Sequence, residues 1–245
     1  GPSEATGLPP KFYRVLRPDS GNETVRIVKE VLRKSDGSAL RSRVEIVGVG
    51  FEWPNVGMIY GFDTTLGYNP LRLSDYSKAT GARDTVAGPD QRVFAPLFPS
   101  YKSPLANMLG LRAIVSGVPI EQIDHTLKSD DLKLIAKTKD AWIYENPESL
   151  PRVLFVRQWQ IADFDKLLET GQWPLFNPTK TVLLEEAPSR KISIGDDTKV
   201  KPQSVRIVKY ENTKVIIEVV SDHSGLVVLN DVWHPWWFAK VNGEA

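Results

Sequence analysis

The residues best suited to ligand chemistry gather in a dense aromatic turn close to the end of the sequence. Indole rings can stack on the apolar faces of sugars, while a nearby imidazole and carboxylate bond the sugar hydroxyls. The candidate ligand contacts in this turn are Asp231, Trp233, His234, Trp236 and Trp237. Two other interpretations stay open, because large aromatic side chains also fill cores and tryptophan also lies at membrane surfaces. Since Pro235 bends the chain, we expect at least two of the three tryptophans to be buried.

A second group of candidate ligand contacts lies in the glycine-rich loop 60–71 and directly after it. Glycine and proline let the backbone turn tightly, and rings, amides and charged groups on such a loop suit ligand contact. The candidates are Asp63, Tyr68, Asn69 and Arg72. The alternative is a packed structural loop in which Tyr68 fills the interior.

Catalytic and metal-binding patterns are missing from the sequence. The acids that could form a glycosidase-like pair are isolated from one another, namely Asp63, Asp75, Asp84, Glu145 and Asp231. The three histidines at 125, 223 and 234 lack metal-ligand spacing, and no phosphate-loop, dinucleotide or nucleophile-elbow pattern occurs. We therefore predict no catalytic residue, no metal ion and no cofactor.

Composition and charge exclude several classes of function. Hydrophobic residues make up 41% of the 245 residues and charged residues 25%, which is typical of a folded globular chain. The net charge is +1, and basic and acidic residues are intermixed, so nucleic acid is not an expected partner. The chain has no cysteine, which excludes disulfides, thiolate catalysis and cysteine-ligated zinc. No apolar run approaches the roughly 18–20 residues of a membrane-spanning helix.

The elements that must position the candidate residues fall into two parts. Over 11–130, helical and strand-like periodicities alternate, which predicts an α/β part. We expect a helix that Asn22 caps, strands at 43–49, 58–62 and 111–115, a helix at 71–80 and a helical turn at 104–109. The boundary with the second part falls within 130–150, and the two parts could share a sheet.

The second part, 131–245, reads as a series of short strands. Strand-like runs occur at 132–138, 141–145, 153–160, 181–185, 204–210, 215–220 and 226–229, with one helix at 163–170. This spacing predicts an antiparallel, jelly-roll-like β-sandwich, in which the runs 215–220 and 226–229 are neighbours. The predicted fold class is therefore α+β, with an N-terminal α/β part followed by a β-sandwich part.

A hairpin turn is predicted at the end of the chain. Asn242-Gly243 favours a type I′ turn, because both central residues of that turn need positive φ. The strand that should return from this turn is almost absent from the sequence. We therefore expect the sandwich to be truncated and the chain to be a piece of a longer protein.

Four segments, taken in order, resemble one protein family. They are Gly-Tyr-Asn-Pro-Leu-Arg-Leu at 67–73, Leu-Ala-Asn-Met-Leu-Gly-Leu-Arg at 105–112, Tyr-Glu-Asn-Pro to Pro-Arg-Val at 144–153, and the strand and aromatic turn at 225–243. Together they are similar to the extracytoplasmic region of YfhO-like bacterial polytopic membrane proteins, which are relatives of glycosyltransferases that use lipid-linked sugar donors. The resemblance covers about residues 50–245. The many spanning helices of that family are absent here, and so is the membrane-loop acid that acts as the base in such transferases, so no catalytic residue carries over.

The resemblance implies a function and a location. It implies a non-catalytic domain on the periplasmic face of the bacterial inner membrane, within a multi-pass protein of cell-envelope sugar transfer. The expected partners are the protein's own transmembrane region and a glycan or lipid-linked acceptor, which the domain would recognise or position. The alternatives are a free carbohydrate-binding module, an accessory domain of a secreted hydrolase, and a purely structural assembly domain.

Overall fold

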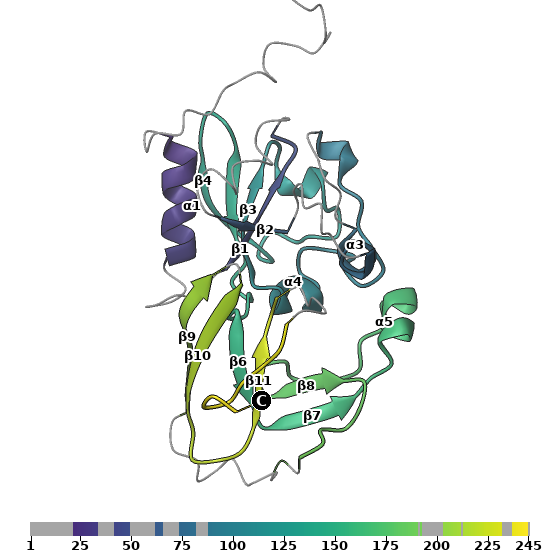
Figure 1. Cartoon of the computed structure of the whole chain (residues 1–245). Helices are drawn as coiled ribbons and strands as arrows, with labels where there is room; N and C mark the ends of the chain where they lie inside the picture. The colour runs from purple at the N-terminus through teal and green to yellow at the C-terminus, as the bar shows by residue number, and fades with distance from the viewer. Residues whose placement is uncertain are drawn as a thin grey trace, which may run out of the picture.

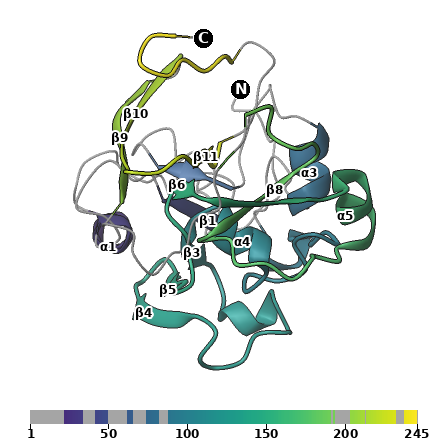
Figure 2. The same cartoon turned by 90° about the horizontal axis from the view of Figure 1, so that it is seen from below.

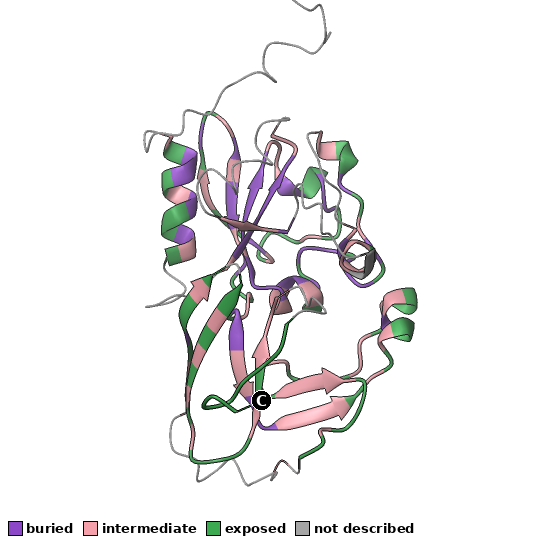
Figure 3. Cartoon of the chain, in the orientation of Figure 1, coloured by how far each residue is buried: buried purple, intermediate pink, exposed green. Residues whose placement is uncertain are grey.

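The computed structural model describes residues 22–33, 42–49, 62–65, 74–81, 88–190, 192, 203–211, 213–231 and 237–244. Within these residues the chain is α+β, as predicted. One mixed five-stranded sheet lies above three two-stranded sheets in the orientation of Figure 1. Buried residues concentrate in the upper sheet, and the lower strands are mainly half-buried or exposed (Figure 3).

The five-stranded sheet has the order β2-β1-β3-β5-β4. Its strands are β1 (Arg43–Val47), β2 (Asp63–Thr64), β3 (Leu111–Ser116), β4 (Lys133–Lys137) and β5 (Trp142–Glu145). Strand β1 runs parallel to β2 and β3, and β5 runs antiparallel to β3 and β4. All five residues of β1 are buried, because a strand in a parallel ladder is covered on both faces.

Helix α1 (Glu23–Arg33) covers one face of this sheet, and α3 (Ser74–Thr80) and α4 (Pro104–Met108) lie on the other side (Figures 1 and 2). The amide of Val25 donates to the side chain of Asn22 over 3.2 Å, which confirms the predicted cap. The core beneath α1 contains Val28, Val31, Val44, Ile46, Ala113, Val115, Ala141 and Ile143.

A larger core fills the opposite face of the sheet. It is built by the chain between β2 and β5, which includes the short 3₁₀ helices η3 (Pro89–Gln91) and η4 (Ile120–Gln122). Its fully buried members include Val47, Phe98, Tyr101, Leu111, Ile114 and Ile120. Because side chains alternate along a strand, neighbouring residues of β1 and β3 enter different cores. The sheet is therefore rigidly held from both sides.

The lower part consists of three strand pairs. They are β6 (Val153–Val156) with β11 (Leu226–Leu229), β9 (Ser204–Glu211) with β10 (Lys214–Val220), and β7 (Gln158–Ile161) with β8 (Thr181–Leu184). The first two pairs are antiparallel and the third is parallel. Seen from below, they spread from the β9–β10 hairpin through β6 and β11 to β8 and α5 (Phe164–Thr170) (Figure 2).

The predicted antiparallel sandwich is not confirmed, and the predicted pairing of 215–220 with 226–229 is wrong. Strand β10 pairs with β9, and β11 pairs with β6, so the two runs belong to different sheets. The chain passes close to β6 just before β11: a Cβ built on Gly225 would lie 2.4 Å from the ring of Phe155 and 2.8 Å from the carbonyl oxygen of Val156, so the approach requires glycine. Alternating sequence predicts a strand but does not select its partner.

The parallel pair β7–β8 also departs from an antiparallel sandwich. Parallel neighbours need a long crossover, and helix α5, which was predicted at 163–170, lies in that connection. Strands β4 and β5 join the five-stranded sheet, so the change from upper to lower sheets falls between Glu145 and Val153. This interval extends past the predicted window of 130–150, and the division of the chain into the parts 11–130 and 131–245 stays a prediction.

The turn at the end of the chain agrees with its prediction. Asn242 and Gly243 both have positive φ, at 51° and 88°. The amides of Val241 and Glu244 donate to each other's carbonyls over 2.8 and 3.0 Å, which closes the turn. All described residues from 237 to 244 are exposed, so this hairpin packs against no core in the described part of the chain.

Candidate functional site

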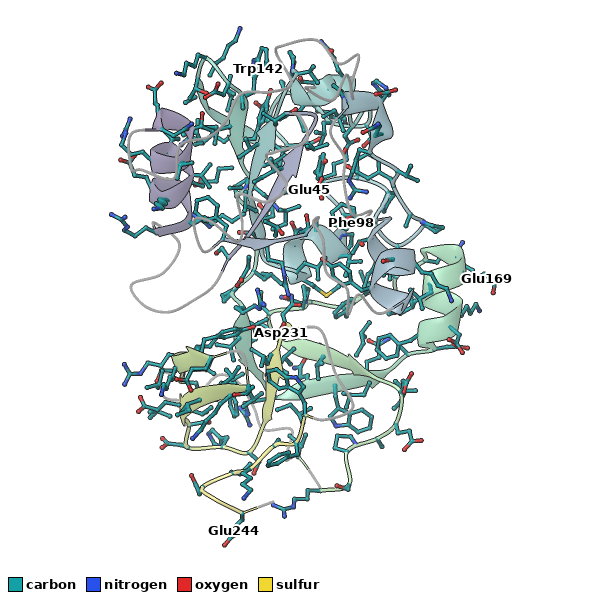
Figure 4. All side chains as sticks on the ribbon, turned by 45° about the horizontal axis from the view of Figure 1, so that its top comes forward. Glu45, Phe98, Trp142, Glu169, Asp231 and Glu244 are labelled. Atoms are coloured by element: carbon teal, nitrogen blue, oxygen red, sulfur yellow. The ribbon has the colours of Figure 1, made fainter. Side chains whose placement is uncertain are left out.

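Two of the predicted ligand contacts, Asp63 and Asp231, meet at one buried arginine. The guanidinium of Arg152 lies 3.5 Å from Oδ2 of Asp63 and 3.3 Å from Oδ1 of Asp231. Figure 4 labels Asp231 at the junction between the upper sheet and the small lower sheets. The structure thus brings together one residue from each of the two segments that the sequence singled out.

Three further side chains complete this group. The hydroxyl of Tyr210 donates a hydrogen bond to Asp231 and accepts one from Nη2 of Arg152 over 3.3 Å. Nη2 of Arg43 lies 3.9 Å from Oδ1 of Asp231 and donates to the backbone carbonyl of Asn230 over 3.2 Å. We call the whole group the junction cluster; it comprises Arg43, Asp63, Arg152, Tyr210, Asn230 and Asp231.

Strand register explains why these distant residues meet. Arg43 and Asp63 are paired at the start of the parallel strands β1 and β2. In the antiparallel pair β6–β11, Leu229 is paired with Val153, so the end of β11 lies beside the start of β6. The amide of Asn230 accordingly donates to the carbonyl of Arg152 over 2.8 Å. The junction cluster therefore forms where β1 and β2 begin and β11 ends.

Within the junction cluster the arginines are more deeply buried than the carboxylates. The side chains of Arg43 and Arg152 are only 5% and 3% exposed, whereas those of Asp63 and Asp231 are 26% and 19% exposed. A buried guanidinium is tolerated only when acceptors surround it, and here two carboxylates balance two arginines. The carboxylates are thus more exposed than the arginines, although Oδ2 of Asp63 is itself buried.

Burial also sets two pKa values within the cluster. It lowers the pKa of Arg43, and the neighbouring charge of Arg152 acts in the same direction. Burial raises the pKa of Tyr210, and the hydrogen bond to Asp231 adds to this increase. The phenol of Tyr210 therefore remains a neutral hydrogen-bond donor at physiological pH.

Most of the other predicted contacts lie outside the described residues: Tyr68, Asn69, Arg72, Trp233, His234 and Trp236. Trp237 is described and is 39% exposed, so it does not fill a core. The expectation that at least two of the three tryptophans are buried now depends on Trp233 and Trp236, and it stays a prediction.

Sequence reasoning missed four members of the junction cluster, Arg43, Arg152, Tyr210 and Asn230. Arg43 opens a buried strand that also contains Glu45, and a charged residue in such a strand needs a buried partner. Arg152 follows a proline inside the segment 144–153, which resembles the corresponding segment of the YfhO-like family. These two positions carried a usable pattern, whereas Tyr210 and Asn230 did not.

A second polar group lies deep under the sheet. Glu45 accepts from Nε of Arg92 over 3.1 Å, from the hydroxyl of Thr65 over 2.8 Å and from the hydroxyl of Tyr101. The guanidinium of Arg92 also lies 4.5 Å from the ring centre of Phe94. The side chains of Glu45 and Arg92 are 0% and 1% exposed, so this group is closed to any ligand and holds the fold.

The buried phenol of Tyr101 predicts a loss of stability at alkaline pH. Burial raises the pKa of Tyr101 well above its ordinary value, and the nearby charge of Glu45 adds to the effect. Above pH about 10 the unfolded chain releases this proton while the folded chain keeps it. The free energy of unfolding should then fall by up to about 1.4 kcal/mol per pH unit for this one group.

Denaturant unfolding between pH 8 and pH 11, from about two units below to about one unit above the ordinary tyrosine pKa, measures this slope. Tyr101→Phe should make the slope shallower, since the replaced ring has no proton to lose. A slope unchanged by Tyr101→Phe would show that other groups cause the alkaline loss.

Elsewhere, one open hollow of about 240 Å³ lies beside β4 and β5, with Glu121, Lys128 and Tyr144 on its wall. This volume is below the range of roughly 300–1,000 Å³ that ligand pockets usually have. The hollow contains none of the predicted contacts. It therefore gives no competing site.

Among the described residues, no three His, Asp or Glu side chains lie close enough together to hold a metal ion. No helix in the described part of the chain has the length and apolar character needed to cross a membrane. No family model, curated protein or solved structure matches the chain. The junction cluster and the contacts between the segments that surround it therefore carry the functional proposal below.

Proposed function

We propose that this chain is a non-catalytic, extracytoplasmic domain of a cell-envelope sugar-transfer protein, and that it recognises a glycan or a lipid-linked acceptor at the junction cluster. One observation carries the proposal: Arg152 holds together Asp63 and Asp231, which were chosen as ligand contacts from two separate segments. Partly exposed carboxylates that buried arginines hold in place are suited to accept hydrogen bonds from sugar hydroxyls.

Contacts between the family-like segments support the same proposal. Nδ2 of Asn146 donates to the side chain of Asn107 over 2.9 Å, and Arg112 lies 3.5 Å from Glu145. These two contacts join the segments 105–112 and 144–153. The ion pair between Arg152 and Asp231 joins 144–153 to 225–243. Polar contacts thus join three segments that are far apart in the sequence.

A purely structural domain is the second candidate. The charge balance of the junction cluster favours it, because a neutral set of paired charges also serves as a joint between sheets. A ligand-binding measurement separates the two candidates.

The test is a titration of the chain with the trimer of N-acetylglucosamine, followed by ligand-observed NMR or calorimetry. We expect Asp231→Asn and Asp63→Asn each to weaken binding by about tenfold, since a hydrogen bond to a charged group contributes roughly 1.5–3 kcal/mol. Asp165→Asn is the matched control, because Asp165 is exposed in α5 and should leave binding unchanged.

Binding that survives both cluster substitutions would place the ligand elsewhere. The absence of any binding to this and related neutral oligosaccharides would favour the structural domain. The gene sequence on either side of the chain adds an independent check. Encoded membrane helices would support the proposed parent protein, and a signal peptide with a hydrolase domain would support the alternative.

A further inference from the structure

We propose that Asn242-Gly243 is a self-modification site, at which the asparagine converts to aspartate or isoaspartate without any enzyme. It is the only Asn-Gly pair in the sequence. The pair forms the centre of the exposed turn 241–244, and both residues have positive φ. This inference is independent of the proposed function, because it concerns a reaction within the chain itself.

The reaction needs only these two residues and water. The backbone nitrogen of Gly243 loses its proton to solvent and bonds to Cγ of Asn242. The Cγ–Nδ2 bond breaks, and the side-chain nitrogen takes one proton from water and leaves as ammonia. Water then opens the resulting succinimide ring: attack at Cγ gives aspartate, and attack at the main-chain carbonyl gives isoaspartate. One water is consumed and one ammonia is released, with no oxidant and no cofactor.

The structure leaves the reacting atoms accessible. Gly243 has no Cβ to shield its nitrogen, and a Cβ built there would meet no atom within 4 Å. Two backbone hydrogen bonds close the turn, between Val241 and Glu244 over 2.8 and 3.0 Å. In Figure 4 the side chain of Glu244 points away from the rest of the chain. Local opening of such an exposed turn costs little free energy, so the nitrogen of Gly243 can reach Cγ of Asn242.

The other described asparagines differ from Asn242. Three have side-chain oxygens that accept hydrogen bonds within the fold; they are Asn22, Asn107 and Asn230. Two precede prolines, whose nitrogen has no hydrogen to lose; they are Asn146 and Asn177. The side chain of Asn242 forms no hydrogen bond with the part of the chain that the structure describes. Within that part, the reaction should therefore be confined to Asn242.

The two products have different effects on the turn. Aspartate followed by glycine still favours a type I′ turn, so this product keeps the hairpin. Isoaspartate lengthens the main chain by one carbon and so removes the register in which Val241 and Glu244 are paired. Both products add a negative charge at neutral pH. The reaction thus changes the charge of the turn and, through isoaspartate, opens it.

The test is incubation of the whole chain at neutral and at mildly alkaline pH. Peptide mapping by mass spectrometry detects the replacement of NH₂ by OH, and a methyltransferase specific for isoaspartate identifies that product. A short peptide with the sequence of residues 239–245 is the unstructured reference. We expect Asn242 to convert at a rate within about tenfold of the peptide's, and faster at the higher pH. Asn107 and Asn230 are the internal controls and should stay unconverted.

Two variants separate the chemistry from the conformation of the turn. Asn242→Gln should abolish the reaction, because the ring would need six members. Gly243→Ala should slow it, because the methyl group shields the nitrogen, although alanine at positive φ weakens the turn. A rate in the chain more than about tenfold below that of the peptide would overturn the proposal, since the folded turn would then prevent the reaction. A faster reaction in Gly243→Ala would lead to the same conclusion.

Discussion

Arg92→Met should lower the free energy of unfolding by about 3–5 kcal/mol, because it leaves the carboxylate of Glu45 buried without its cation. Arg92 donates two hydrogen bonds to Glu45, over 3.1 and 3.3 Å. The side chain of Glu45, which lies in β1, is completely buried. Methionine fills a similar volume but cannot donate a hydrogen bond. Urea unfolding monitored by fluorescence and circular dichroism measures the loss.

Two further variants locate the cause of this loss. Arg206→Met is the control, because it removes an ion pair with Glu218 in which both side chains are more than half exposed. This variant should leave the free energy of unfolding near that of the parent chain. The double variant Glu45→Met with Arg92→Met should recover part of the loss, because no charge is then left buried. An equal loss in the single and double variants would mean that packing around Arg92, and not its charge, is responsible.

Arg152→Met should cost about 2–3 kcal/mol of stability and should also remove most glycan binding. The stability loss is smaller than for Arg92, because Asp63 and Asp231 are partly exposed and water can replace part of what Arg152 supplies. The binding loss follows because the two carboxylates would no longer be held together. Chemical unfolding and titration with the N-acetylglucosamine trimer should be run on the same preparation.

Tyr210→Phe is the matched variant for this second prediction. It removes one hydrogen bond to Asp231 and keeps the ring and the arginine. We expect a loss of about 1 kcal/mol and a modest decrease in binding. If Arg152→Met bound the trimer as well as the parent chain does, the junction cluster would be a structural joint only.

The sequence predicted the positions of helices, strands and turns better than it predicted which strands pair with each other. Asn22 as a cap, Gly243 in a turn and the alternation of 204–210 are local patterns, and each corresponds to an observed element. The pairing of β11 with β6 instead brings Gly225 close to Phe155. That contact joins residues far apart in the sequence, so no local period encodes it.

The candidate site was predicted in part for the same reason. Asp63 and Asp231 were predicted because they lie in a glycine-rich and an aromatic segment, both of unusual composition. Arg152, which joins them, is a single charged residue before a strand, and its role emerges only when β6 and β11 are paired. Glu45 and Arg92 were missed because the sequence does not show that both side chains are buried, and only burial makes the ion pair between them necessary.

The most direct test of the junction cluster as a ligand site is NMR mapping of the bound N-acetylglucosamine trimer. In a ¹⁵N-labelled chain, the Nε–H of Arg152 and the backbone amides of Thr64 and Asp231 should shift in proportion to the bound fraction. Amides beside the hollow at Tyr144 should stay unchanged and serve as the internal reference. Shifts confined to other regions, or no shift at Arg152 under saturating trimer, would contradict the account.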